Sequence, residues 1–116
     1  MYDHIGLRVK DVEVSRRFYR ATLEALGLVQ DSSGGSGPAG GAPGLWLHEE
    51  QQSAGGAHIA FRATDRESVE RFHAAGLSAG GRDNGKPGLR AEYSPCYFAA
   101  FLIDPDGNNV EAVCQE

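Results

Sequence analysis

The sequence contains an internal repeat at a spacing of 54 residues. The run His4–Val9 aligns with His58–Ala63, and eight of the eighteen positions from 4 to 21 are identical to their counterparts. Roughly one identity is expected by chance at average residue usage. A repeat of this length indicates two copies of one supersecondary unit, which bury their apolar faces by packing together. Each copy carries a histidine at the same place, where a metal shared between the copies could be held.

Length and charge restrict the class of protein. The 116 residues suit one domain made of two modules, about 1–50 and 56–116, joined by a short linker. A net charge of −5 argues against nucleic acid and anionic membranes as partners. No apolar run approaches the ~18 residues of a membrane span, and no signal peptide precedes Met1. The two cysteines are too few for a disulfide framework. These features predict a cytoplasmic protein.

Each copy opens with the pattern of a strand followed by a helix. Apolar and polar residues alternate over 2–9 and again over 57–63, as in half-buried strands. Asp11 and Asp65 then stand where helix N-caps are expected. The first helix carries an apolar stripe and is expected to end at Gly27, and the second to end at Gly76.

The remainder of each copy reads as strands and loops. The Gly/Ser/Pro/Ala stretch 32–44 is expected to be a mobile surface loop. The glycine-rich tract 80–88 lacks the phosphate-loop pattern and is expected to be a turn-rich connection. A hairpin turn is predicted at Asp104–Asn108. Strands are expected at 45–48, 88–93, 97–103 and 109–113. The chain therefore has the pattern of an α+β protein.

Three side chains suggest a metal site. His4 and His58 lie on the polar faces of their strands, and Glu111 lies on the last strand with Val110 and Ala112 on its other face. Two imidazoles and one carboxylate form a ligand set that leaves positions open for water or substrate. A divalent ion there would act as a Lewis acid or lower the pKa of bound water. The competing interpretation is that the histidines are surface residues, repeated because the unit was duplicated.

Other polar residues have two interpretations each. His48 or Glu49 would be a fourth ligand or an exposed strand end, and His73 is expected to pack or lie at the surface. Arg8 and Arg62 would bind an anionic substrate or, as we favour, close salt bridges between the modules. The candidates for a general base are Glu92 and Tyr93. The aromatic residues expected in a pocket or in the core are Tyr93, Tyr97 and Phe98.

Three runs resemble the vicinal oxygen chelate superfamily, which includes glyoxalase I, fosfomycin-resistance proteins, bleomycin-resistance proteins and extradiol dioxygenases. They are Asp3–Val9, His58–Phe61 and Phe101–Glu111. The stretch Asp83–Arg90, followed by Tyr93-Ser94-Pro95, is similar to a small glyoxalase-like subgroup. The resemblance implies two tandem βαβββ modules forming a curved mixed sheet around a central cavity, usually in a homodimer. It also implies that His4, His58 and Glu111 bind zinc, manganese, nickel or iron(II).

The resemblance supports more than one function. The favoured hypothesis is a metal-dependent lyase, isomerase or ring-opening enzyme that chelates adjacent oxygens of a small substrate. The alternatives are a metal-free protein that sequesters a drug-like molecule, as bleomycin-resistance proteins do, and an iron(II) dioxygenase of the extradiol type. The fourth ligand of glyoxalase I has no clear counterpart, which counts against a true glyoxalase I. Pairing of the modules within one chain or between two subunits stays open.

Overall fold

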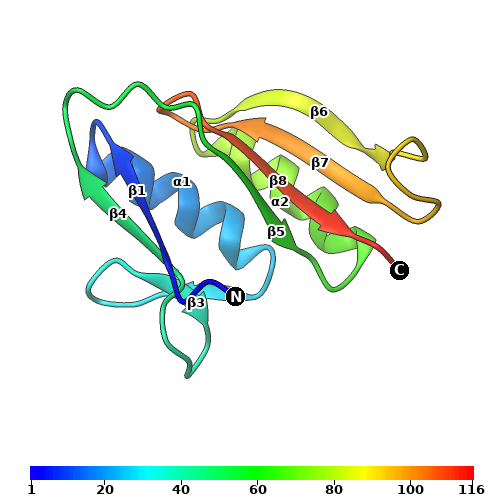
Figure 1. Ribbon diagram of the computed structural model, residues 1–116, viewed down its shortest axis with the longest axis horizontal. Coiled ribbons are helices and arrows are strands. Elements are labelled where there is room, and N and C mark those ends of the chain that lie inside the picture. The colour runs from blue at the N-terminus through cyan, green and yellow to red at the C-terminus, as the bar shows by residue number, and fades with distance from the viewer.

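The computed structural model describes residues 1–116 and contains two consecutive βαβββ modules (Figure 1). The first module comprises β1 (Ile5–Val9), α1 (Val12–Glu24), β2 (Leu28–Gln30), β3 (Ser36–Pro38) and β4 (Leu45–Glu49). The second comprises β5 (His58–Arg62), α2 (Arg66–Ser78), β6 (Arg82–Leu89), β7 (Phe98–Ile103) and β8 (Asn109–Cys114). The predicted α+β class and the two-module architecture are confirmed.

The strands form two four-stranded sheets, one for each module. Their orders are β1-β4-β3-β2 and β5-β8-β7-β6, so β1 and β5 are edge strands at equivalent places. The pairs β1/β4 and β5/β8 are parallel, and the other pairs are antiparallel. In Figure 1 the two edge strands run in opposite directions. Within one chain the expected curved sheet is therefore present as two halves that no strand pairing joins.

Each sheet is covered on one face by the helix of its own module, and the two helices pack against each other. The other side of each sheet, which we call its open face, has no helix on it (Figure 1). The predicted apolar stripe of α1 is confirmed, because Ser15, Phe18, Tyr19, Thr22 and Leu23 are buried. The strands contribute alternate residues to the core beneath the helices, among them Leu7, Val9, Ile59, Val110 and Ala112.

The two predicted N-caps are present, but one predicted helix end is wrong. The Asp11 carboxylate accepts hydrogen bonds from the amides of residues 13 and 14, and the Asp65 carboxylate accepts one from residue 68. Helix α2 does not stop at Gly76 but continues to Ser78. A Cβ at Gly76 would overlap the side chain of Leu102. This glycine therefore serves close packing of α2 on the sheet rather than helix termination.

Two glycine-rich stretches are more ordered than predicted. The stretch 32–44 contains β3, in which Ser36 is buried and pairs with both neighbouring strands. The tract 80–88, expected to be a connection, forms most of β6 and pairs with β7 through an irregular register. Each of these strands is held by pairing with the strands next to it, and the local composition does not reveal such pairing.

The predicted hairpin turn between β7 and β8 is confirmed, and it also joins the two modules. Asp104 accepts hydrogen bonds from the Tyr19 hydroxyl of α1 and from the Asn108 side chain. The Asp106 carboxylate accepts bonds from the Ser15 hydroxyl and from the Lys10 amide at the end of β1. Tyr19, Ser15, Asp104 and Asn108 are buried, so these bonds are shielded from water.

The bond between Tyr19 and this turn leads us to expect a loss of stability in alkali. Burial is the largest cause that raises the pKa of Tyr19 far above its usual value, and the neighbouring Asp104 carboxylate is the second. An unfolded tyrosine ionises near pH 10, so the unfolded chain loses this proton before the folded chain does. The free energy of unfolding should therefore fall as the pH rises above about 10, and more steeply than in Tyr19→Phe. Denaturant unfolding at several pH values measures both slopes, and equal slopes would contradict the assignment.

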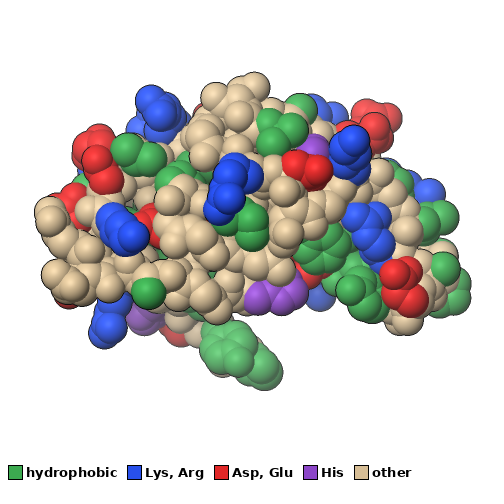
Figure 2. Space-filling view, turned by 90° about the horizontal axis from the view of Figure 1, so that it is seen from above, with side chains coloured by type: hydrophobic (Ala, Val, Ile, Leu, Met, Phe, Trp, Pro, Cys, Tyr) green, Lys and Arg blue, Asp and Glu red, His purple; other side chains and the backbone are tan.

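The surface carries charges of both signs. Lys, Arg, Asp and Glu side chains are interspersed over the face shown in Figure 2, with no continuous basic stripe on it. Neither of the two helices has the length and apolarity needed to cross a membrane.

Candidate metal centre

The open face of the second sheet brings His58 and Glu111 together. His58 begins β5, and Glu111 lies on the neighbouring strand β8, in register with Ala60. Parallel pairing with this register places both side chains on the same face. His58 Nε2 lies 2.7 Å from Glu111 Oε1. An imidazole nitrogen and a carboxylate oxygen therefore converge on one point of the surface.

Tyr97 is hydrogen-bonded to the other oxygen of the Glu111 carboxylate. Its hydroxyl donates to Glu111 Oε2 at 2.6 Å, and its ring meets Tyr93 edge-on at a centroid distance of 5.1 Å. Burial and this hydrogen bond raise the pKa of Tyr97 to about 12, so the hydroxyl keeps its proton near neutral pH. Tyr97 thus fixes the orientation of Glu111 and leaves Oε1 for His58. From the sequence, Tyr97 is expected only as an aromatic residue of a pocket or of the core, since no motif in the sequence links it to Glu111.

His4 lies just before β1 of the first sheet and makes no contact with this pair. Its imidazole is exposed, and Nδ1 lies 2.7 Å from the Asp3 carboxylate. With Nδ1–H donating to Asp3, the lone pair on Nε2 is free to bind a ligand, as in many metal-binding histidines. No group of three or more His, Cys, Asp or Glu side chains converges within the chain. The structure therefore assembles His58 with Glu111 and leaves His4 as a separate, equivalent position.

The two residues considered as a fourth ligand lie on opposite faces of β4. His48 pairs with Arg8, and its Nε2 lies near Gly6, so it shares the open face of the first sheet with His4. Glu49 points the other way and accepts a hydrogen bond from the Val12 amide at the start of α1. Glu49 is therefore engaged at the helix N-terminus, whereas His48 remains on the side of His4.

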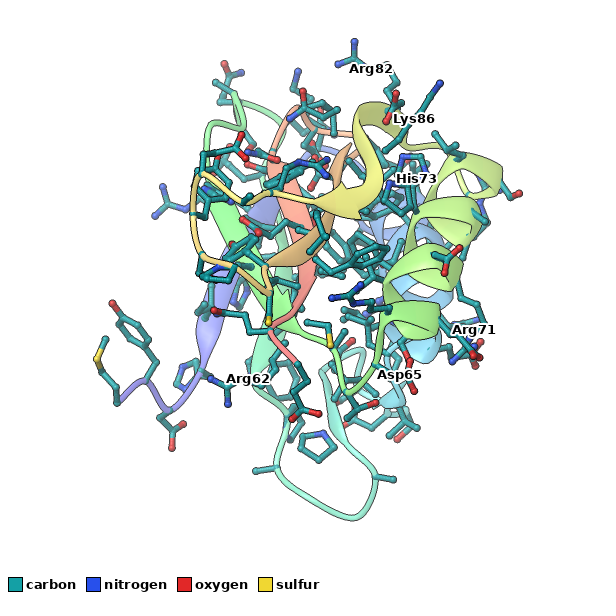
Figure 3. The ribbon with its side chains drawn as sticks, turned by 90° about the vertical axis from the view of Figure 1, so that its right-hand side faces the viewer. Arg62, Asp65, Arg71, His73, Arg82 and Lys86 are labelled. Carbon is teal, nitrogen blue, oxygen red and sulfur yellow. The ribbon has the colours of Figure 1, made fainter.

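The favoured interpretation of the two repeated arginines is not seen, because neither has a carboxylate within ion-pair distance in the chain. Arg62 lines a pocket of 460 Å³ together with Tyr97, whose hydroxyl bonds to Glu111. Figure 3 shows Arg62 on the side of the sheet opposite α2. Arg8 lines a separate pocket of 730 Å³ between β1 and the linker.

The remaining predicted residues fall outside the pair or at its margin. His73 is buried between α2 and β6, where its Nε2 lies 2.8 Å from Asp83, near Lys86 in Figure 3. Glu92 is exposed on the loop between β6 and β7, and Tyr93 on the same loop reaches Tyr97. Phe98 points to the core side of β7, where it packs against the core cluster.

The residues present fit a divalent ion as part of a site. A histidine and a glutamate that converge on an open face are donors that zinc, manganese, nickel and iron(II) all accept. The Glu111 residue is 2% exposed, and no lysine or arginine lies within ion-pair distance of its carboxylate. A cation at this point would balance that buried charge. A third donor must come from outside the pair.

Comparison with known proteins identifies the family. A model of the Glyoxalase/Bleomycin resistance protein/Dioxygenase superfamily matches residues 2–112. The chain belongs to this superfamily. A glyoxalase/bleomycin resistance protein from Albidiferax ferrireducens T118 is 30% identical, with a TM-score of 0.79, and the match covers 100% of this chain and 99% of that one. Among curated protein sequences, no relative matches the chain.

Two further solved structures share the fold of this superfamily member. A glyoxalase/dioxygenase from Nostoc punctiforme is 23% identical, with a TM-score of 0.72. The match covers 100% of this chain and 91% of the Nostoc chain. A glyoxalase/bleomycin resistance protein/dioxygenase family enzyme from Burkholderia phytofirmans PsJN is 16% identical with a TM-score of 0.70, and 97% of each chain is covered. The family match over residues 2–112 confirms the family that the sequence resembles, and these structures agree with its fold.

Proposed function

We propose that this protein is a divalent-metal-dependent, glyoxalase-like enzyme that acts on a small substrate through two adjacent oxygens. The observation that carries the proposal is the convergence of His58 and Glu111 on an open sheet face, with Tyr97 orienting the carboxylate. A sequestering protein without a metal has no use for such a pair. The bound ion would supply a Lewis acid for oxygens that gain negative charge during the reaction.

We further propose that the site is completed in a homodimer by His4 of the partner subunit. The repeat gives His4 and His58 equivalent positions, His4 just before β1 and His58 at the start of β5, and each of these edge strands has one edge without a strand partner in the chain. A twofold axis that sets β1 of one subunit against β5 of the other would create two identical sites. Each site would then combine one exposed imidazole with one His58–Glu111 pair. The free edge of an edge strand is also a natural surface for association.

Mixing two inactive variants tests this arrangement. His4→Ala and His58→Ala should each lose tight metal binding, since each removes one ligand from every site. In a mixed dimer of the two, one site keeps His4 from one subunit and the His58–Glu111 pair from the other. After subunits exchange, an equal mixture should bind about a quarter of an equivalent of metal per protomer. Metal content after gel filtration measures this.

The remaining outcomes separate the alternatives. A mixture that binds no metal, while the wild-type protein binds one equivalent, would place all ligands within one chain and refute the shared site. A wild-type protein that binds none of zinc, manganese, nickel or iron(II) would refute the enzyme proposal and favour the metal-free binding protein. Full metal content in either single variant would remove that histidine from the site.

A further inference from the structure

A second charged group stands beside the candidate metal centre. Arg90 follows β6, and its side chain turns back along the open face of the second sheet. Its two terminal nitrogens donate to main-chain oxygens, Nη1 to Gly88 at 2.9 Å and Nη2 to Lys86 at 2.7 Å. These two bonds fix the guanidinium in one place, so little side-chain freedom remains for a ligand to restrict.

The ring of Phe101 connects this guanidinium to the metal ligands. The Arg90 guanidinium carbon lies 5.5 Å from the ring centroid, on which it stacks as a cation on an aromatic face. Phe101 pairs with Glu111 across β7 and β8, and its ring centroid lies 6.4 Å from that of His58. Phe101 therefore has the guanidinium as one neighbour and the candidate ligand His58 as another.

The backbone of β6 is shaped to admit this arrangement. Gly85 has φ +155°, in the region that favours glycine, at an irregularity in the β6–β7 register. A Cβ there would lie 2.9 Å from the Phe101 ring and 3.2 Å from Arg90 Nη2. The glycine thus lets the strand approach both groups closely. The glycine-rich tract 80–88, expected from the sequence to be a connection, therefore supplies the main-chain oxygens that hold the Arg90 guanidinium.

The positive charge of Arg90 is not neutralised within the chain. No carboxylate lies within ion-pair distance of it, whereas Arg16 and Arg71 each have a glutamate partner. A guanidinium has five N–H donors, and two are used here. Arg90 is half-buried, and its Nε is not among the buried side-chain atoms without a partner, so three N–H donors remain without a partner in the chain. A fixed, partly bonded and uncompensated guanidinium is suited to bind an oxyanion.

We infer that Arg90 determines substrate specificity by binding an anionic group, carboxylate or phosphate, of the molecule whose adjacent oxygens reach the metal. The inference rests on the proposed function and names the substrate class of the same site. Arg62 is less suited to this role, because it is exposed at the end of β5 and no hydrogen bond or aromatic ring holds its guanidinium.

Three hydroxamates test the inference, because a hydroxamate chelates a metal through two adjacent oxygens. Acetohydroxamate has no further charge, succinate monohydroxamate carries a carboxylate, and phosphonoacetohydroxamate carries a phosphonate. Calorimetric titration of the metal-loaded protein should show at least one anionic probe binding about 10-fold or more tighter than acetohydroxamate. The anionic probe that binds more tightly shows whether the substrate carries a carboxylate or a phosphate.

Matched variants assign this preference to one residue. Arg90→Gln should bind acetohydroxamate as the wild type does and lose the preference for the anion, and Arg90→Lys should keep part of it. Arg66→Gln is the control, because Arg66 also stacks on a phenylalanine of β7, at 5.0 Å from the Phe98 centroid but outside the site. It should keep the full preference. Metal content and thermal unfolding of Arg90→Gln show whether the β6 backbone and the centre remain intact.

The outcomes distinguish this inference from the proposed function. Equal affinity of the wild type for all three probes, with metal bound, would overturn the anion site and leave the metal enzyme standing. Loss of the preference in Arg62→Gln but not in Arg90→Gln would overturn the assignment to Arg90. Loss of metal from Arg90→Gln, regained in Arg90→Lys, would make Arg90 a structural support only. Absence of metal from the wild type would refute the proposed function and this inference with it.

Discussion

Replacing Glu111 with glutamine should weaken metal binding more than about 100-fold, beyond the effect expected for a residue that only supports a ligand. Glutamine has nearly the same size and can still contact Tyr97, but it lacks the negative charge that the ion requires. The Glu111 carboxylate is almost fully buried and touches His58 Nε2 at 2.7 Å. Metal titration against a competing chelator measures the affinity, and the stoichiometry gives the number of sites per protomer.

Glu67→Gln is the control for a change of net charge. Glu67 lies in the first turn of α2, where it pairs with Arg71 at 3.7 Å, away from the open face. Its replacement should leave metal affinity unchanged. Thermal unfolding without metal should show Glu111→Gln folded, because glutamine keeps the volume of the side chain and an oxygen that can accept the Tyr97 hydrogen bond. Unaltered metal affinity in Glu111→Gln would exclude Glu111 as a ligand.

The parts of the fold that follow from local chemistry could be predicted from the sequence. The repeat gave the two modules, and the carboxylates of Asp11 and Asp65 marked the helix starts. The parts fixed by packing or pairing with other elements could not. Gly76 has the sequence pattern of a helix end, yet it is buried where α2 meets Leu102. Likewise β6 is a strand because β7 pairs with it, and its glycines alone favour a turn.

In the candidate site, too, the sequence predicted what local strand patterns determine and missed what the tertiary structure determines. Alternation along β5 and β8 is enough to place His58 and Glu111 on one face, and the structure shows them in contact. The bond from Tyr97 to Glu111 depends on the path of the loop before β7, which the sequence does not reveal. The guanidinium of Arg90 is also positioned by the irregular β6 backbone rather than by any motif. The sequence therefore suggests the ligands, and the tertiary structure supplies the groups around them.

Replacing Asp104 with alanine should destabilise the fold by about 3 to 5 kcal/mol, the range for breaking a buried polar network. One carboxylate oxygen accepts from the amides of residues 106 and 108, and the other accepts from Tyr19 and the Asn108 side chain. Alanine leaves these donors buried without partners. Because Tyr19 belongs to the first module, the loss also loosens the contact between modules. Denaturant unfolding measures the change, and a constant slope with denaturant confirms that the transition stays two-state.

Asp31→Ala is the matched control, because it separates the effect of burial from that of turn chemistry. The Asp31 carboxylate also accepts from two backbone amides and a hydroxyl within its own loop, but it is exposed. Water can replace the lost bonds there, so the cost should be less than about 1 kcal/mol. If Asp104→Ala proves no more costly than Asp31→Ala, the turn does not join the modules. Tyr19→Phe should fall between the two, since it removes one donor and leaves the carboxylate with three.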